Sequence, residues 1–144
     1  MVTITDIRSV NYAEYDEVWA VVRSLKNPGR MGHVPALSPS WELFRKYLRL
    51  RDTGQWNEAS FQEIYVPVFL KEMQFESARR KLNELVWLDR NGKRICLVCF
   101  CPDETLCHRS ILAGMLQHVG TSVQGVTGDY SRYGLAYFEE RMQK

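Results

Sequence analysis

Short apolar runs separated by longer amphipathic stretches organise this chain. Residues 1–7 are rich in Val, Ile and Thr and alternate weakly, whereas residues 18–22 and 95–100 are apolar throughout. Runs of this kind are typical of strands, and residues 122–126 repeat the pattern more weakly. We therefore predict four strands, of which the strand at 95–100 has the strongest signal.

Apolar residues at spacings of three and four predict four helices around these strands. The first follows the cap residue Ser40 and the second follows Asn57, with Pro67 expected to kink it. The others cover residues 75–86 and about 107–118. The side chains expected on the buried helix faces are Trp41, Phe44, Tyr47, Leu48, Phe61, Ile64, Tyr65, Val68, Phe69, Phe75, Ala78, Leu82, Leu85, Val86, Ile111, Leu112, Met115 and Leu116.

Strands that alternate with helices predict a mainly parallel sheet covered on both faces. The predicted fold class is α/β, a small three-layer Rossmann-like domain, and a chain of 144 residues suits a single domain spanning residues 1–144. Residues 26–39 hold three prolines and two glycines, so we expect a long and functional loop there. Ligands of such folds bind beyond the carboxyl ends of the strands. For parallel strands that rule selects four places, namely Arg8-Ser9, Arg23-Ser24, Cys99 to Cys101 and Gly128 to Tyr130.

The composition excludes fewer classes of function than the pattern of apolar positions does. The formal net charge is +2, from 19 basic and 17 acidic residues, which by itself argues for neither nucleic acid nor a membrane. The basic residues gather in two groups that we expect to be solvated helix faces, with a surface for a polyanion as the alternative. The groups are Arg45, Lys46, Arg49 and Arg51, and Arg79, Arg80, Lys81, Arg90, Lys93 and Arg94.

The chain shows no pattern of a secretory signal or a membrane span. No apolar run reaches about 18 residues, and charged residues interrupt the first ten. We therefore expect a cytoplasmic protein with no membrane contact. In that compartment its four cysteines are expected in the core, in a metal site or in catalysis rather than in disulfides.

The chemistry-bearing segment runs from the 95–100 strand into the helix at 107–118. Because side chains alternate along a strand, Cys99 and Cys101 leave by one face, and Cys96 by the other, where it is expected in the core. Pro102 should end the strand, and residues 103–106 should form a turn.

Residues 107–110 are expected to form the first helical turn and an anion-binding cradle. Free backbone N–H groups and the helix dipole favour an anion there. Arg109 adds a bidentate donor and Ser110 a hydroxyl, while Arg8 and Arg23 are the further predicted ligand-binding residues. The alternative is that Arg109 pairs with a carboxylate such as Asp103 or Glu104.

Three cysteines near this helix end are candidate nucleophiles. Cys99, Cys101 and Cys107 are each expected to have a lowered thiol pKa, and His108 could be the base for a thiol or for a bound water. The sequence does not choose among the three thiols, and cysteines that merely fill the core are a further alternative.

The same residues permit a metal interpretation, although no cofactor is predicted. Cys99, Cys101, Cys107 and His108 form a legitimate zinc set with unusual spacing. Adjacent side chains on a helix diverge by about 100 degrees, so Cys107 and His108 could share one ion only if the turn is irregular.

With these residues in view, the chain resembles the domain of unknown function 488 family. The family's mark is a hydrophobic strand running into Cys-x-Glu, a short turn, and Cys-His-Arg at the start of a helix. Here Cys99 and the block Cys107-His108-Arg109 match it, as does the upstream segment Ala36 to Leu43. The likeness covers about residues 18–116, and one departure is Cys101, where the family usually has Glu. The resemblance implies a Rossmann-like α/β domain and no specific activity.

We predict an enzyme, a hydrolase or group transferase, that acts on a phosphate-bearing small molecule such as a nucleotide, or on a nucleic acid. One alternative is a non-catalytic module that binds a nucleotide or a protein, and another is a zinc-stabilised interaction domain. Trp41, Trp56 and the 26–39 loop could supply an aromatic wall, although Trp41 is expected mainly in the core. The oligomeric state is not predicted, and no glycine-rich nucleotide-binding motif follows any strand.

Overall fold

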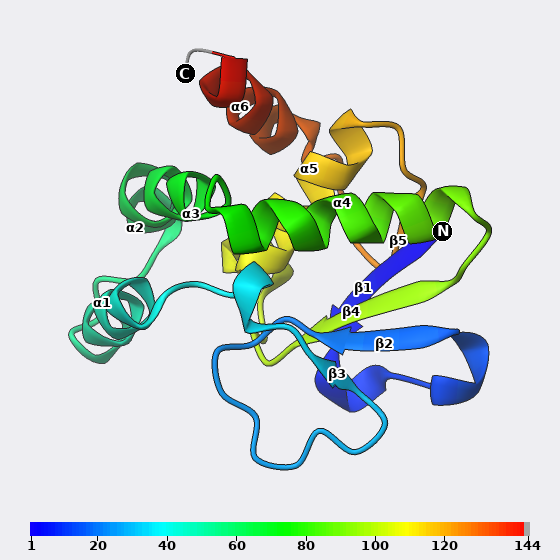
Figure 1. Cartoon of the computed structure of the whole chain (residues 1–144). Coiled ribbons are helices and arrows are strands. Elements are labelled where there is room, and N and C mark those ends of the chain that lie inside the picture. The colour runs from blue at the N-terminus through cyan, green and yellow to red at the C-terminus, as the bar shows by residue number, and fades with distance from the viewer. Residues whose placement is uncertain (143–144) are drawn as a thin grey trace.

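In the computed structural model of this protein, which describes residues 1–142, the strands form one parallel sheet (Figure 1). Within those residues the sheet has five strands in the order β3-β2-β4-β1-β5. The strands are β1 (Val2–Asp6), β2 (Glu17–Ala20), β3 (Gly32–His33), β4 (Ile95–Cys99) and β5 (Val123–Gln124). All five residues of the central strand β4 are buried. The α/β class and the parallel sheet are therefore confirmed.

The helices follow the predicted order, with one addition. They are α1 (Trp41–Asp52), α2 (Glu58–Ser60), the π-helical η4 (Phe61–Tyr65), α3 (Val66–Glu72), α4 (Glu76–Arg90), α5 (His108–His118) and α6 (Ser131–Met142). Short 3-10 turns cover η1 (Ile7–Ser9), η2 (Tyr12–Glu14), η3 (Pro35–Leu37) and η5 (Glu104–Leu106). Helix α6 was not predicted from the sequence.

The two faces of the sheet are covered differently. Figure 1 shows α4, α5 and α6 on one side of the sheet and the η1–η2 segment on the other. Tyr15, just after η2, interacts with the Cys96 thiol, which is fully buried. Cys96 therefore lies on the face opposite Cys99, as predicted.

Several details differ from the sequence-based expectation. β3 lies inside the predicted 26–39 loop, where Gly32 pairs with Trp19 of β2. Three side chains expected in the core, Trp41, Val68 and Phe75, are exposed. Phe75 is the cap residue before α4 rather than part of its buried stripe, and Trp41 is the first residue of α1. The second helix is not merely kinked, because η4 inserts a π-helical turn before Pro67, which falls in the first turn of α3.

The basic groups lie largely on α1 and α4 and are partly paired. Among the described residues, four ion pairs involve them, namely Arg51–Asp52, Arg80–Glu76, Lys81–Glu84 and Arg94–Asp16. These pairs are mostly solvent-exposed, as expected for solvated helix faces. Within residues 1–142, no helix has the length and apolar character that a membrane crossing needs.

Candidate functional site

The turn between β4 and α5 holds the chemistry-bearing residues in one place. The Asp103 carboxylate accepts hydrogen bonds from the backbone N–H and the hydroxyl of Thr105, which shapes the turn. The Glu104 carboxylate accepts bonds from Thr127 and from the Tyr130 hydroxyl, which ties the turn to the chain after β5. The turn is thus fixed from two sides.

The sulfur atoms of three cysteines meet at this turn. Sγ of Cys99 lies 3.5 Å from Sγ of Cys107, and the Sγ atoms of Cys99, Cys101 and Cys107 all lie within 4.8 Å of one another. Cys101 and Cys107 are joined in a disulfide, with their Cα atoms 6.0 Å apart. The expectation that the cysteines avoid disulfides is therefore wrong for this pair, because the short turn brings the two residues within the normal bridging range.

His108 is the first residue of α5, and its imidazole is held by the neighbouring strand end. Its Nε2 lies 2.7 Å from the backbone oxygen of Val21, so Nε2–H donates this bond and Nδ1 keeps a lone pair. That Nδ1 lies 3.6 Å from Sγ of Cys107. Burial lowers the pKa of His108 to about 4, and the Arg109 charge adds to the shift. The resting imidazole is therefore neutral, with its open nitrogen toward the sulfur of Cys107.

The thiols outside the disulfide are not acidic. Burial raises the pKa of Cys99, against the opposing effects of the Cys101 backbone N–H and the Arg109 charge. Burial also raises the pKa of Cys96, to about 11. The expected lowering of the thiol pKa is therefore wrong for Cys99.

The three arginines predicted to bind a ligand differ in their burial and in their hydrogen-bond partners. Arg109 is only 7% exposed, its Nη2 donates to the backbone oxygen of Cys101, and its Nε is buried with no hydrogen-bond partner among residues 1–142. Glu104 bonds elsewhere, and no ion pair joins Arg109 to Asp103 or Glu104 in the described chain. That alternative is therefore not realised.

The other two arginines are anchored near strand ends. Arg8 pairs with Asp6, and this contact lowers the pKa of Asp6 to about 2. Arg23 donates through Nε to the Pro39 carbonyl and through Nη2 to the Pro35 carbonyl. The Ser110 hydroxyl is turned inward and donates to the Cys107 carbonyl. Of the predicted ligand-binding residues, only Arg23 lines the cavity described next.

An aromatic-walled cavity of about 130 Å³ opens over Cys101, Cys107 and His108. Its other lining residues are Val22, Arg23, Ser24, Pro39, Trp41, Phe44, Tyr47, Tyr65, Phe100 and Leu106. Trp41 and Phe100 are about half exposed, which places them at the rim. Trp56 does not line the cavity but supports it, because its ring packs against Tyr47 and Tyr65.

Sequence reasoning missed most of these wall residues. Phe44, Tyr47 and Tyr65 were assigned to the buried faces of helices, and helical spacing alone does not distinguish a core from a cavity wall. A possible signal was the density of aromatic residues on two consecutive helices, opposite a strand end that carries cysteines.

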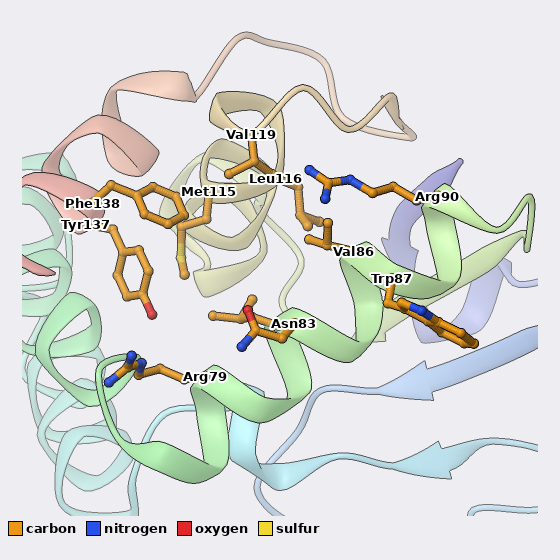
Figure 2. A pocket seen from close by; sticks show the side chains of 11 residues that line it. Arg79, Asn83, Val86, Trp87, Arg90, Met115, Leu116, Val119, Tyr137 and Phe138 are labelled. Carbon is orange, nitrogen blue, oxygen red and sulfur yellow. The ribbon is translucent and has the colours of Figure 1, made fainter.

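A second cavity, of about 370 Å³, lies between α4, α5 and α6. Figure 2 shows Arg79 and Arg90 toward its opposite ends, while the Trp87 ring turns away from Phe138. Neither cysteine nor histidine lines this cavity. Cys101, Cys107 and His108 line the smaller cavity instead.

Comparison with known proteins identifies a family for this chain. No curated protein and no solved structure matches the chain. A family model described as the active DUF488-N3 subclade matches residues 4–120. This range holds β2, β3, β4, most of β1 and the whole turn between β4 and α5, but not β5. The chain thus belongs to the family of domain of unknown function 488.

Proposed function

We propose that this protein is an enzyme, a hydrolase or group transferase, that acts on a phosphate-bearing nucleotide with Cys107 as its nucleophile. The observation that carries the proposal is the pairing of Cys107 with the open Nδ1 of His108 at the floor of an aromatic-walled cavity. The matching family model is described as an active subclade, which agrees with an enzyme.

Cys107 is the best placed of the three thiols. It lines the cavity and lies next to the His108 base, 3.6 Å from Nδ1. It is also the N-cap of α5, where the helix dipole and free backbone N–H groups favour a thiolate. Cys99 does not line the cavity, and burial raises its pKa. Cys101 lines the cavity without a base beside it, so it is assigned the role of disulfide partner.

The walls of the cavity suit the binding of a flat ring better than the binding of a phosphate group. Trp41, Phe44 and Tyr47 offer faces on which a base can stack, and stacking on aromatic rings contributes about 1–3 kcal/mol for each base. The phosphate would remain at the rim with Arg23, whose guanidinium is held in place by two backbone carbonyls. This arrangement favours a nucleotide over a bare phosphate ester.

The reaction requires the reduced protein. As Sγ of Cys107 forms a bond to the electrophilic centre of the substrate, the thiol proton passes to Nδ1 of His108. The leaving group departs with its bonding electron pair and receives that proton. Water or an acceptor then releases the group from sulfur, and its proton returns to the thiol. Because imidazole is neutral at rest, it accepts the proton only as the bond forms.

The test is a turnover screen on reduced protein against ribonucleotides, dinucleotides and short RNA, with products and protein adducts identified by mass spectrometry. We expect turnover to fall by about 100-fold or more in Cys107→Ser and in His108→Gln, as for loss of a nucleophile or its base. Cys96→Ser is the matched control, because Cys96 is a buried thiol on the opposite face of the sheet. Undiminished turnover in Cys107→Ser would refute the proposal.

Binding without turnover would favour the non-catalytic module instead. Trp41→Ala separates ligand binding from folding, because Trp41 is 47% exposed at the cavity rim. We expect this change to weaken nucleotide binding about tenfold, the equivalent of one stacked base, with little loss of stability.

A further inference from the structure

We infer that the reduced protein binds one zinc ion through Cys99, Cys101, Cys107 and Nδ1 of His108, which the turn between β4 and α5 brings together. This site is a different use of residues that the proposed function also employs, and it does not depend on that function. An ion held there would occupy Cys107 and His108, so the metal-bound form would be catalytically silent.

Two of the distances between the ligand atoms match those around a tetrahedral ion. A zinc–sulfur bond of about 2.3 Å and a zinc–nitrogen bond of about 2.0 Å place neighbouring ligand atoms about 3.5–3.8 Å apart. Sγ of Cys99 and Sγ of Cys107 are 3.5 Å apart, and Sγ of Cys107 is 3.6 Å from Nδ1 of His108. Cys101 lies in the same cluster, with all three sulfurs within 4.8 Å of one another.

The sequence-based objection to this site was that Cys107 and His108 are adjacent. On a regular helix their side chains would diverge, but Cys107 is the N-cap, with an extended backbone at φ −130° and ψ 149°. Of the two residues only His108 belongs to the first helical turn, and Sγ of Cys107 lies 3.6 Å from Nδ1 of His108. The irregular turn that the metal interpretation requires is therefore present.

His108 is already oriented as a metal ligand. Metal-binding imidazoles usually donate their second ring N–H to a carboxylate or a backbone carbonyl, which fixes the tautomer and the ring direction. Nε2 of His108 makes such a bond to the Val21 carbonyl, at 2.7 Å. The ring is buried and packs 5.6 Å from the Phe69 ring, so it cannot turn away without repacking the core.

The charge and the access route also suit an ion. Three thiolates, one imidazole and Zn²⁺ carry a net charge of −1, and the guanidinium of Arg109 lies beside them, bonded through Nη2 to the Cys101 carbonyl. Arg109 is buried with its Nε unsatisfied among the described residues, so a negatively charged neighbour would stabilise it. Cys101, Cys107 and His108 line the open cavity, through which an ion can enter.

Metal binding and the disulfide exclude one another. A phosphine reductant and one water convert the Cys101–Cys107 disulfide into two thiols and give the phosphine oxide. Zn²⁺ then binds the three sulfurs as thiolates and displaces the protons that the thiols carry. Oxidation of the same pair removes two of the four ligands.

The test uses the full chain, reduced, freed of reductant under anaerobic conditions and titrated with Co²⁺. We expect one cobalt for each chain, with a sulfur-to-metal charge-transfer band and intense tetrahedral d–d bands, all removed by one equivalent of Zn²⁺. Oxidised protein should show neither band. Cys99→Ser and Cys107→Ser should lose stoichiometric binding, and His108→Gln should shift the d–d bands and weaken zinc binding by tenfold or more.

Two matched controls guard against nonspecific effects. Cys96→Ser removes a buried thiol on the opposite face, and His33→Gln removes an imidazole whose Nε2 bonds the neighbouring Val22 carbonyl. Both should keep the wild-type cobalt spectrum, and circular dichroism of each variant checks that it is folded. No tetrahedral cobalt in reduced wild type, an unchanged spectrum in folded His108→Gln, or equal losses in Cys96→Ser and Cys99→Ser would overturn the inference.

The outcome is separable from that of the proposed function. The titration contains no nucleotide, and turnover is measured with a chelator present. Turnover in chelator without cobalt binding would refute the zinc site alone. Cobalt binding in a protein that turns over nothing would refute the proposed function alone.

Discussion

The neutral imidazole of His108 should make the stability of this protein depend on pH in a range where few other groups titrate. In the folded state its pKa is lowered to about 4 by burial, against a usual value of 6.5. Between these values the unfolded chain binds more protons than the folded chain at this residue, so the free energy of unfolding decreases as the pH falls. Below about pH 4 this group contributes no further change.

The size of the effect follows from the two pKa values. The full shift corresponds to about 3 kcal/mol, at 1.36 kcal/mol for each pKa unit. From about pH 7.5 to pH 5 the imidazole alone should remove about 2 kcal/mol of stability. Asp6 acts at lower pH, because its pKa is lowered to about 2 from 3.8, so its stabilising contribution is lost only below that range.

The assay is urea unfolding followed by tryptophan fluorescence at a series of pH values, on wild type and His108→Gln in the same redox state. Glutamine can still donate to the Val21 carbonyl but does not titrate. The difference in the free energy of unfolding between wild type and variant should therefore change by about 2 kcal/mol from about pH 7.5 to pH 5. His33→Gln is the matched control, because it removes an exposed imidazole. Parallel curves for wild type and His108→Gln would refute the buried neutral imidazole and, with it, the base assigned to Cys107.

Two further predictions test the packing of α5 against α6 and the hydrogen bonds that anchor the turn before α5. Gly114→Ala should destabilise the protein by about 1–3 kcal/mol in thermal or urea unfolding, because a Cβ there would clash with the Tyr130 carbonyl where α5 meets α6. Helix propensity alone predicts the opposite, a gain of about 1 kcal/mol, so a more stable variant would contradict this packing. Glu104→Gln should cost about 1–3 kcal/mol, because it weakens charge-assisted bonds from Thr127 and Tyr130, and hydrogen exchange of the 101–107 turn should accelerate. Unchanged exchange in that variant would show that the turn does not depend on this anchor.

The sequence predicted the framework of the fold because burial left a clear periodic signal. Residues 95–99 are uniformly apolar and form the central strand, buried on both faces. Strand β3 was missed because it has only two residues, Gly32 and His33, and their pairing with β2 leaves no local pattern in the sequence. Helix α6 does carry a signal, since Tyr130, Tyr133 and Tyr137 recur at helical spacing, but its glycine and scattered charges obscure it.

The location of the site was predictable, whereas the roles within it were not. The rule that ligands bind beyond strand ends selected the 99–101 segment, and Arg23 does line the cavity that opens there. Arg8, selected by the same rule, is instead held by Asp6. The cavity walls come from α1 and η4, and their approach to the strand end is a tertiary arrangement that spacing along the chain does not encode.

Cys101 shows how one side chain can change the behaviour of this site. The resemblance drawn from the sequence implies Glu at this position in relatives, and a carboxylate can neither form a disulfide with Cys107 nor supply a third thiolate. In this chain the sulfur of Cys101 can form the disulfide or act as a metal ligand, because it lies in the same cluster as the sulfurs of Cys99 and Cys107. The nucleophile proposed here is therefore exposed to two controls, oxidation and metal binding, that both act on the same sulfur atom. Since each control removes the ligand or partner that the other requires, the reduced, metal-free protein is the one form in which Cys107 and the open nitrogen of His108 can act together.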